Sequence, residues 1–87
     1  MAVNTGEVAV FQCQHPSAQF IHWKINEHPL GDPYPPGITT PRFGQLHIRG
    51  HPVYNGTRIT CIAFISGLHT ASPTVTLTVY TGIINSI

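Results

Sequence analysis

Histidine is the residue type in this sequence that most suggests metal chemistry, because imidazole nitrogens are common ligands of zinc and other transition metals. The 87 residues include six histidines. No histidine pair lies on a segment with helical periodicity, and side-chain alternation directs His22 and His47 outward on strands of different sheets. The other histidines fall in expected turns. We therefore predict no metal site and no cofactor, and expect surface histidines that add pH sensitivity only where they meet a partner.

Nucleophilic catalysis is the second chemistry to consider. A serine nucleophile needs a base and an orienting acid close in space. The only acids are Glu7, Glu27 and Asp32, and no nucleophile motif surrounds any serine. Cys13 and Cys61 are candidates either for a catalytic thiol or for a covalent staple, which would help a chain whose hydrophobic core is small. The sequence predicts that the protein is not an enzyme.

Short runs of alternating apolar and polar residues predict the strands that position these groups, and no stretch keeps helical periodicity. We predict strands at residues 7–14, 20–26, 45–49, 57–65 and 74–80. Cys13, Trp23 and Cys61 all fall on inward faces. The other inward positions are Ala9, Phe11, Ile21, Ile25, Leu46, Ile48, Ile59, Ala63, Ile65, Val75, Leu77 and Val79.

The segment 28–41 has five prolines, which exclude a helix and confine any strand there to a sheet edge. Residues 38–40 are expected to add one short strand. Residues 81–87 show no strand pattern and are interpreted as a linker or tail, so that one domain spans residues 1–80.

The charge composition excludes nucleic acid as a partner. Charged residues make up 8% of the chain, against about 25% in typical domains, and the four basic residues are scattered. Residues 1–4 do not resemble a signal peptide, and no run approaches the roughly 18 apolar residues of a membrane span. A fragment of a secreted or membrane-anchored parent would look the same, so membrane association is expected only through a parent chain.

Cys13, Trp23 and Cys61 resemble the frame of the immunoglobulin superfamily, in which a tryptophan on strand C packs against a bridge between cysteines on strands B and F. The resemblance extends from about residue 3 to residue 80, with 23–26 similar to strand C, 44–48 to strand E and 73–80 to strand G. It implies an all-β, antiparallel sandwich of two sheets and about seven strands, with an inter-sheet Cys13–Cys61 disulfide. The short interval between the cysteines is more similar to the compact C2 or I sets than to a variable domain.

The chain departs from the family at the tyrosine corner. The family usually has a tyrosine two residues before the second cysteine, and an aspartate earlier that pairs with an arginine near strand D. This chain has Ile59 and Asn55 at those positions. We therefore expect no tyrosine-corner hydrogen bond, and expect Tyr54 to brace the loop differently.

Asn55, Gly56 and Thr57 form an N-glycosylation sequon just before the strand that resembles strand F. The alternative is a simple Asn-Gly turn. Together with the disulfide that the resemblance implies, the sequon favours a secretory route and an extracellular or cell-surface location.

The face formed by the strands that resemble C, F and G carries more large apolar groups than a solvated sheet face normally does. We predict a protein contact there at Phe20, His22, Ile62 and Phe64, either with a ligand or with an identical domain; Arg58 and Tyr80 are further outward positions. The alternative is that neighbouring domains or the proline-rich loop cover these side chains. The loop 66–70 is a second recognition candidate, with Leu68 and His69 at its tip, or else an inert turn.

These observations favour an extracellular immunoglobulin-like binding module, a receptor or adhesion domain acting in cell-surface recognition or immune-type signalling, with a homodimer as one expected form. The alternative is a structural spacer in a chain of tandem immunoglobulin domains. A binding scaffold engineered on this frame is a third interpretation, because the fold alone does not choose among roles.

Overall fold

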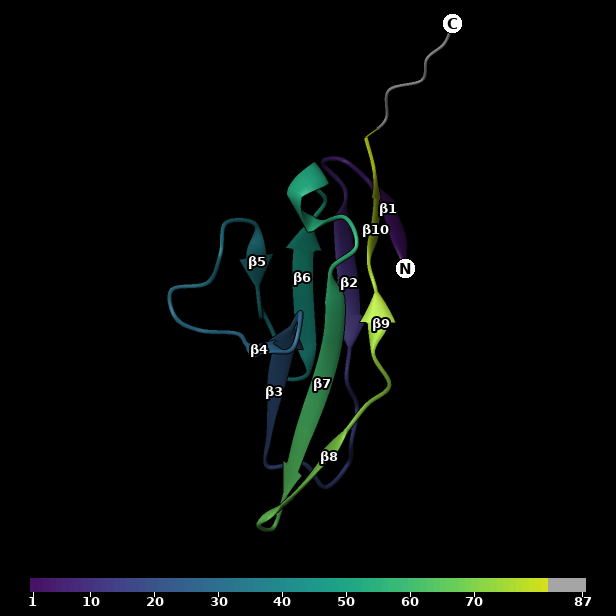
Figure 1. The fold of residues 1–87 in the computed structure, drawn as a ribbon. Helices are drawn as coiled ribbons and strands as arrows, with labels where there is room; N and C mark the ends of the chain where they lie inside the picture. Colours follow the sequence, from purple (N-terminus) through teal and green to yellow (C-terminus); the bar gives the residue numbers. More distant parts are fainter. Residues whose placement is uncertain (82–87) are drawn as a thin grey trace, which may run out of the picture.

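The computed structural model describes residues 1–81 (Figure 1). The expected tail therefore lies outside the described residues except for Thr81. Within the described range all regular structure is β apart from one 3-10 turn, η1 (Pro52–Tyr54). No helix there is long and apolar enough to cross a bilayer. The strands are β1 (Ala2–Asn4), β2 (Val8–Gln12), β3 (Phe20–Ile25), β4 (His28–Pro29), β5 (Ile38–Thr39), β6 (Gln45–Arg49), β7 (Arg58–Ile65), β8 (Leu68–Ala71), β9 (Val75–Thr76) and β10 (Thr78–Tyr80).

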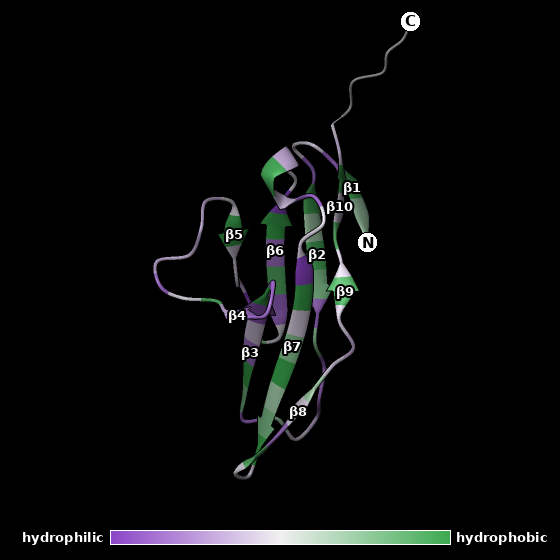
Figure 2. Ribbon diagram, in the orientation of Figure 1, coloured by the Kyte–Doolittle hydropathy of each residue, from purple (hydrophilic) through white to green (hydrophobic). Residues whose placement is uncertain are grey.

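The strands form two layers with one core between them (Figure 1). One sheet has the order β2-β6-β5, and the other has the order β4-β3-β7-β8 with β9 also paired to β7. β1 pairs in parallel with β10 beside these sheets. Burial alternates between successive residues along most of β2, β6 and β7. In Figure 2 β6 also alternates in hydropathy, whereas β2 and β7 carry hydrophobic residues on both faces. The alternation of burial lets each sheet bury one face, and it confirms the predicted all-β sandwich.

The core contains Trp23 and the disulfide, as predicted from the sequence. Trp23 is 7% exposed and lies directly opposite Cys61 on the neighbouring strand β7. A disulfide joins Cys61 to Cys13, which follows the last residue of β2, so the bridge connects the two sheets as predicted. Leu46, Ile48 and Leu77 are the largest fully buried side chains.

The predicted strand 74–80 is wrong as a single element. The chain pairs with β7 through β8, breaks at Ser72 and Pro73, pairs again through β9, and then leaves β7 for β1 as β10. The break has a physical cause, because proline has no N–H for the ladder. The Ser72 hydroxyl accepts a hydrogen bond from the Cys61 N–H instead, at 3.0 Å. In consequence Val75, expected inside, is 41% exposed.

The corner before β7 is held by two side chains in place of the family's tyrosine. The Tyr54 hydroxyl donates to the carbonyl oxygen of Pro36 at 2.6 Å, so the bracing expected of Tyr54 at this corner is a bond to the proline-rich segment. The Asn55 side-chain oxygen accepts from the Val79 N–H at 2.9 Å and so ties η1 to β10.

A tight hairpin that was not expected from the sequence leads into the proline-rich segment. Asn26 and Glu27 both have positive φ, 51° and 69°, which is the backbone of a two-residue type I′ turn between β3 and β4. β4 then pairs with only Lys24 and Ile25 of β3. The expected short strand at 38–40 is present as β5 at the edge of the other sheet.

Candidate functional site

The outer face of β3, β7 and β8 carries a cluster of rings that we call the ring patch: Phe20, His22, Phe64 and His69. Strand register explains the cluster, because Phe20, Phe64 and His69 lie side by side on three neighbouring strands. The ring centroid of Phe64 is 5.1 Å from that of Phe20, 5.5 Å from that of His22 and 5.8 Å from that of His69. These are the separations of aromatic rings in direct contact.

Exposure differs within this patch. Phe20 is 53% exposed and both histidines are exposed, whereas Phe64 at the centre is half-buried by its neighbours. Ile62 adjoins the patch because it lies directly between His22 and Ala71, and it is also half-buried. The structure therefore brings together the predicted face residues Phe20, His22, Ile62 and Phe64, and it adds His69 to them.

Leu68 and His69 do not lie at a loop tip. The turn between β7 and β8 consists of Ser66 and Gly67, whose φ angles of 47° and 83° fit a type I′ hairpin, and β8 begins at Leu68. Leu68 pairs with Ile65, so it points to the opposite side of the sheet from His69. Leu68 is 74% exposed because the hairpin extends past the core.

Two residues expected on this face lie away from the ring patch. Tyr80 belongs to the β1–β10 pair, because the chain leaves β7 after β9. Arg58, at the far end of β7, pairs with Glu27 at 3.6 Å. Both charged side chains of this pair are largely exposed, so the pair contributes little to stability.

The histidines do not build a metal site in the part of the chain that the structure describes. His22 and His69 both contact Phe64, yet no group of three potential ligand side chains gathers within residues 1–81.

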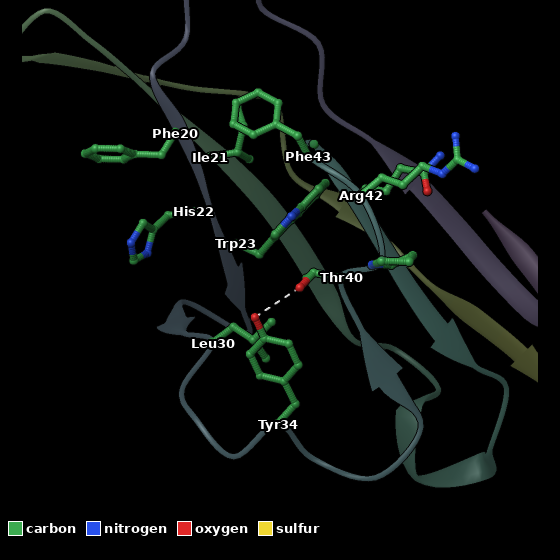
Figure 3. A pocket seen from close by; sticks show the side chains of 12 residues that line it. Phe20, Ile21, His22, Trp23, Leu30, Tyr34, Thr40, Arg42 and Phe43 are labelled. Atoms are coloured by element: carbon green, nitrogen blue, oxygen red, sulfur yellow. Dashed lines mark hydrogen bonds between the residues drawn. The ribbon is translucent and has the colours of Figure 1, made fainter.

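A second feature is a hollow of about 450 Å³ at the open edge of the sandwich, which we call the edge groove (Figure 3). One wall is β3 and the other is the segment 40–45 that enters β6. Trp23 lies at its floor, and the ring of Phe43, which is 66% exposed, lies near Ile21, as Figure 3 shows. The Tyr34 hydroxyl and the Thr40 side-chain oxygen are 3.1 Å apart and close one end, as the dashed line in Figure 3 shows.

Sequence reasoning missed this groove for an identifiable reason. Tyr34 and Phe43 lie in segments without side-chain alternation, so no pattern assigned them a face. The one available signal was a pair of aromatic residues, Tyr34 within the proline-rich segment and Phe43 just after it.

The sequon has a specific geometry. Asn55 is exposed, and its side-chain oxygen, not the nitrogen that would carry a glycan, makes the bond to Val79. Thr57, the third residue of the triplet, is 4% exposed. Attachment of a glycan at Asn55 stays a prediction.

Comparison with solved structures identifies the fold. The chain is similar to a structure titled "Tandem Ig repeats of Dlar", with a TM-score of 0.74 and 19% sequence identity over 92% of this chain. At this identity the likeness shows the fold. With the disulfide and the two-sheet architecture, it establishes an immunoglobulin-like domain. The aligned region is 43% of that chain, so this protein spans less than half its length. No family model and no curated protein matches the sequence.

Proposed function

We propose that this immunoglobulin-like domain is an extracellular protein-binding module that contacts its partner through the ring patch, in cell-surface recognition or adhesion. The observation that carries the proposal is the ring patch itself. Phe20 presents over half of its surface to solvent and rests against Phe64, and imidazole rings flank Phe64. Large rings at the centre of an interface supply much of the binding free energy of protein complexes.

The chemistry of this patch favours a protein surface as the partner. Aromatic and imidazole rings combine apolar area with a few polar atoms, which suits a contact that forms and dissociates in water. The partner is either a protein ligand or an identical domain, and two identical faces would pair about a two-fold axis. The disulfide favours an oxidising, extracellular setting.

A structural spacer is the alternative function, favoured by the likeness to a structure of tandem immunoglobulin repeats. In that role the ring patch would be covered by a neighbouring domain or would remain unoccupied. The two functions differ in what a change on the patch does to association.

Molar mass in solution across a concentration series tests the homophilic form of the proposal. The variant Phe20→Glu with His69→Glu places charge on the patch at exposed positions, so folding should be preserved. Leu68→Glu is the matched control, because Leu68 lies on the same hairpin but on the opposite side of the sheet. A dimer that the double variant abolishes and the control retains supports self-association through the ring patch.

If the wild-type domain is a monomer at every concentration, self-association through the ring patch is excluded, and the next test is for a different protein as ligand. Fluorescent multimers of the wild-type domain and the two variants would then be applied to a panel of intact cells. Staining that the double variant loses and Leu68→Glu keeps supports a protein ligand. Absence of both association and staining favours the spacer.

A further inference from the structure

The edge groove offers unpaired backbone groups beside an apolar hollow. β3 pairs with β7 along its full length, but on its other side β4 covers only Lys24 and Ile25. Within residues 1–81, no strand lies alongside Phe20 to Trp23 on that side. The free stretch of β3 is thus an edge that another strand could extend.

The direction of the β3 backbone groups follows from two hydrogen bonds. The Asn26 N–H donates to the Arg58 carbonyl beside β7, whereas the Trp23 carbonyl accepts from the Leu30 N–H on the opposite side. Successive residues of an antiparallel strand point their N–H and C=O groups to alternate sides. The Ile21 N–H and C=O and the Trp23 N–H therefore face the edge groove.

The walls of the groove define which side chains fit. Inward side chains of an added strand would lie beside Ile21 and Trp23 and face Phe43 across the groove (Figure 3). Arg42 is the only residue of formal charge among the lining residues, and no carboxylate lines the groove. An occupant with a carboxylate near its apolar side chains would complement this charge.

We propose that the edge groove binds an extended peptide segment of another protein, which adds a strand to the free edge of β3. The segment has apolar side chains at alternate positions and an acidic residue beside them. Main-chain hydrogen bonds to Ile21 and Trp23 supply affinity, and the apolar space between the side chains of Phe43 and Trp23 supplies sequence preference. The edge groove adjoins the ring patch, because Phe20 and His22 line both. Phe43, Arg42 and Tyr34 lie outside the ring patch, so changes at these three residues test the groove and not the proposed function.

A phage-displayed library of short random peptides, selected on the immobilised wild-type domain, tests the proposal. We expect enriched peptides with apolar residues at alternate positions and an adjacent aspartate or glutamate. Phe43→Ala and Arg42→Glu, both at exposed positions, should each weaken binding of an enriched peptide by about tenfold. His69→Glu is the matched control on the ring patch and should leave binding unchanged.

Peptide backbone methylation distinguishes strand addition from other modes of binding. Only alternate N–H groups of an added strand face β3, so N-methylation should weaken binding about fivefold to tenfold at one set of alternate positions and have little effect at the other. Amide hydrogen exchange of Ile21 and Trp23 should slow when the peptide binds.

The opposite results overturn the inference. No enriched peptide, a requirement for proline instead of alternating residues, or equal effects of methylation at all positions would each exclude strand addition. If His69→Glu abolishes binding of the enriched peptides and Phe43→Ala leaves it unchanged, the peptides bind the ring patch. That result would support the proposed function alone. A dimer that Phe43→Ala disrupts would show that a second copy, not a peptide, occupies the groove.

Discussion

Gly44 is expected to be the glycine whose replacement costs most among the described glycines with positive φ, because two separate constraints act on it. It precedes β6 and has a φ of +77°, a backbone conformation that costs an L-amino acid about 1 to 2 kcal/mol. A Cβ atom there would lie 2.5 Å from the carbonyl oxygen of Cys13. The backbone cannot easily yield, because the Cys13 N–H donates to the Gly44 carbonyl at 2.7 Å and Cys13 is held by the disulfide.

The magnitude for Gly44→Ala follows from adding these constraints. Steric overlap in a packed region typically costs a further 1 to 3 kcal/mol or so. We therefore expect Gly44→Ala to lower the free energy of unfolding by about 2 to 5 kcal/mol. Gly67→Ala is the matched control, because Gly67 has a similar φ of +83° but no atom within 4 Å of an added Cβ. This control should lose only about 1 to 2 kcal/mol.

Urea denaturation of both variants and the wild type, with the m-value checked for constancy, measures the difference. Thermal unfolding should agree, since about 1 kcal/mol shifts the Tm of a domain of this size by roughly 4 to 8 °C. Equal losses in Gly44→Ala and Gly67→Ala would refute the argument, because backbone conformation alone would then explain both.

Two further predictions concern the cross-links of the fold. Tyr54→Phe removes the hydrogen bond to the Pro36 carbonyl, so it should lower the free energy of unfolding by about 0.5 to 1.5 kcal/mol and speed amide exchange near Gly37. Unchanged exchange there would show that Tyr54 does not brace this segment. Reduction of the disulfide, which closes a loop of 48 residues, should lower the free energy of unfolding by about 4 kcal/mol. Unfolded protein that has not been reduced should contain no titratable thiol. Reactive Cys13 and Cys61 in such protein would contradict the bridge.

The central strands could be predicted from the sequence because the residues that fill the core recur at every second position along them. The predicted strand at 45–49 coincides with β6, and the predicted strands at 20–26 and 57–65 differ from β3 and β7 by one residue each. The same alternation placed Phe20, His22, Ile62 and Phe64 on one outer face. Register across β3, β7 and β8 then determined that the rings of Phe20, His22 and His69 meet that of Phe64.

The remaining elements depend on interactions that alternation does not encode. β8 has four exposed residues, so no hydrophobic pattern marks it. The sequence 74–80 alternates well, yet it changes partner from β7 to β1, and this change depends on tertiary pairing. The edge groove exists because β4 ends after two residues, and nothing in the sequence alone fixes that length.

The parallel pairing of β1 with β10 has a mechanical consequence. Ala2 lies beside Thr78 and Asn4 beside Tyr80, so the chain enters β1 at one end of the pair and leaves β10 at the other. Tension applied to the two sides of the domain would slide these strands lengthwise past each other. Their hydrogen bonds would then be loaded together instead of one after another, which is the geometry in which a few bonds resist the greatest force.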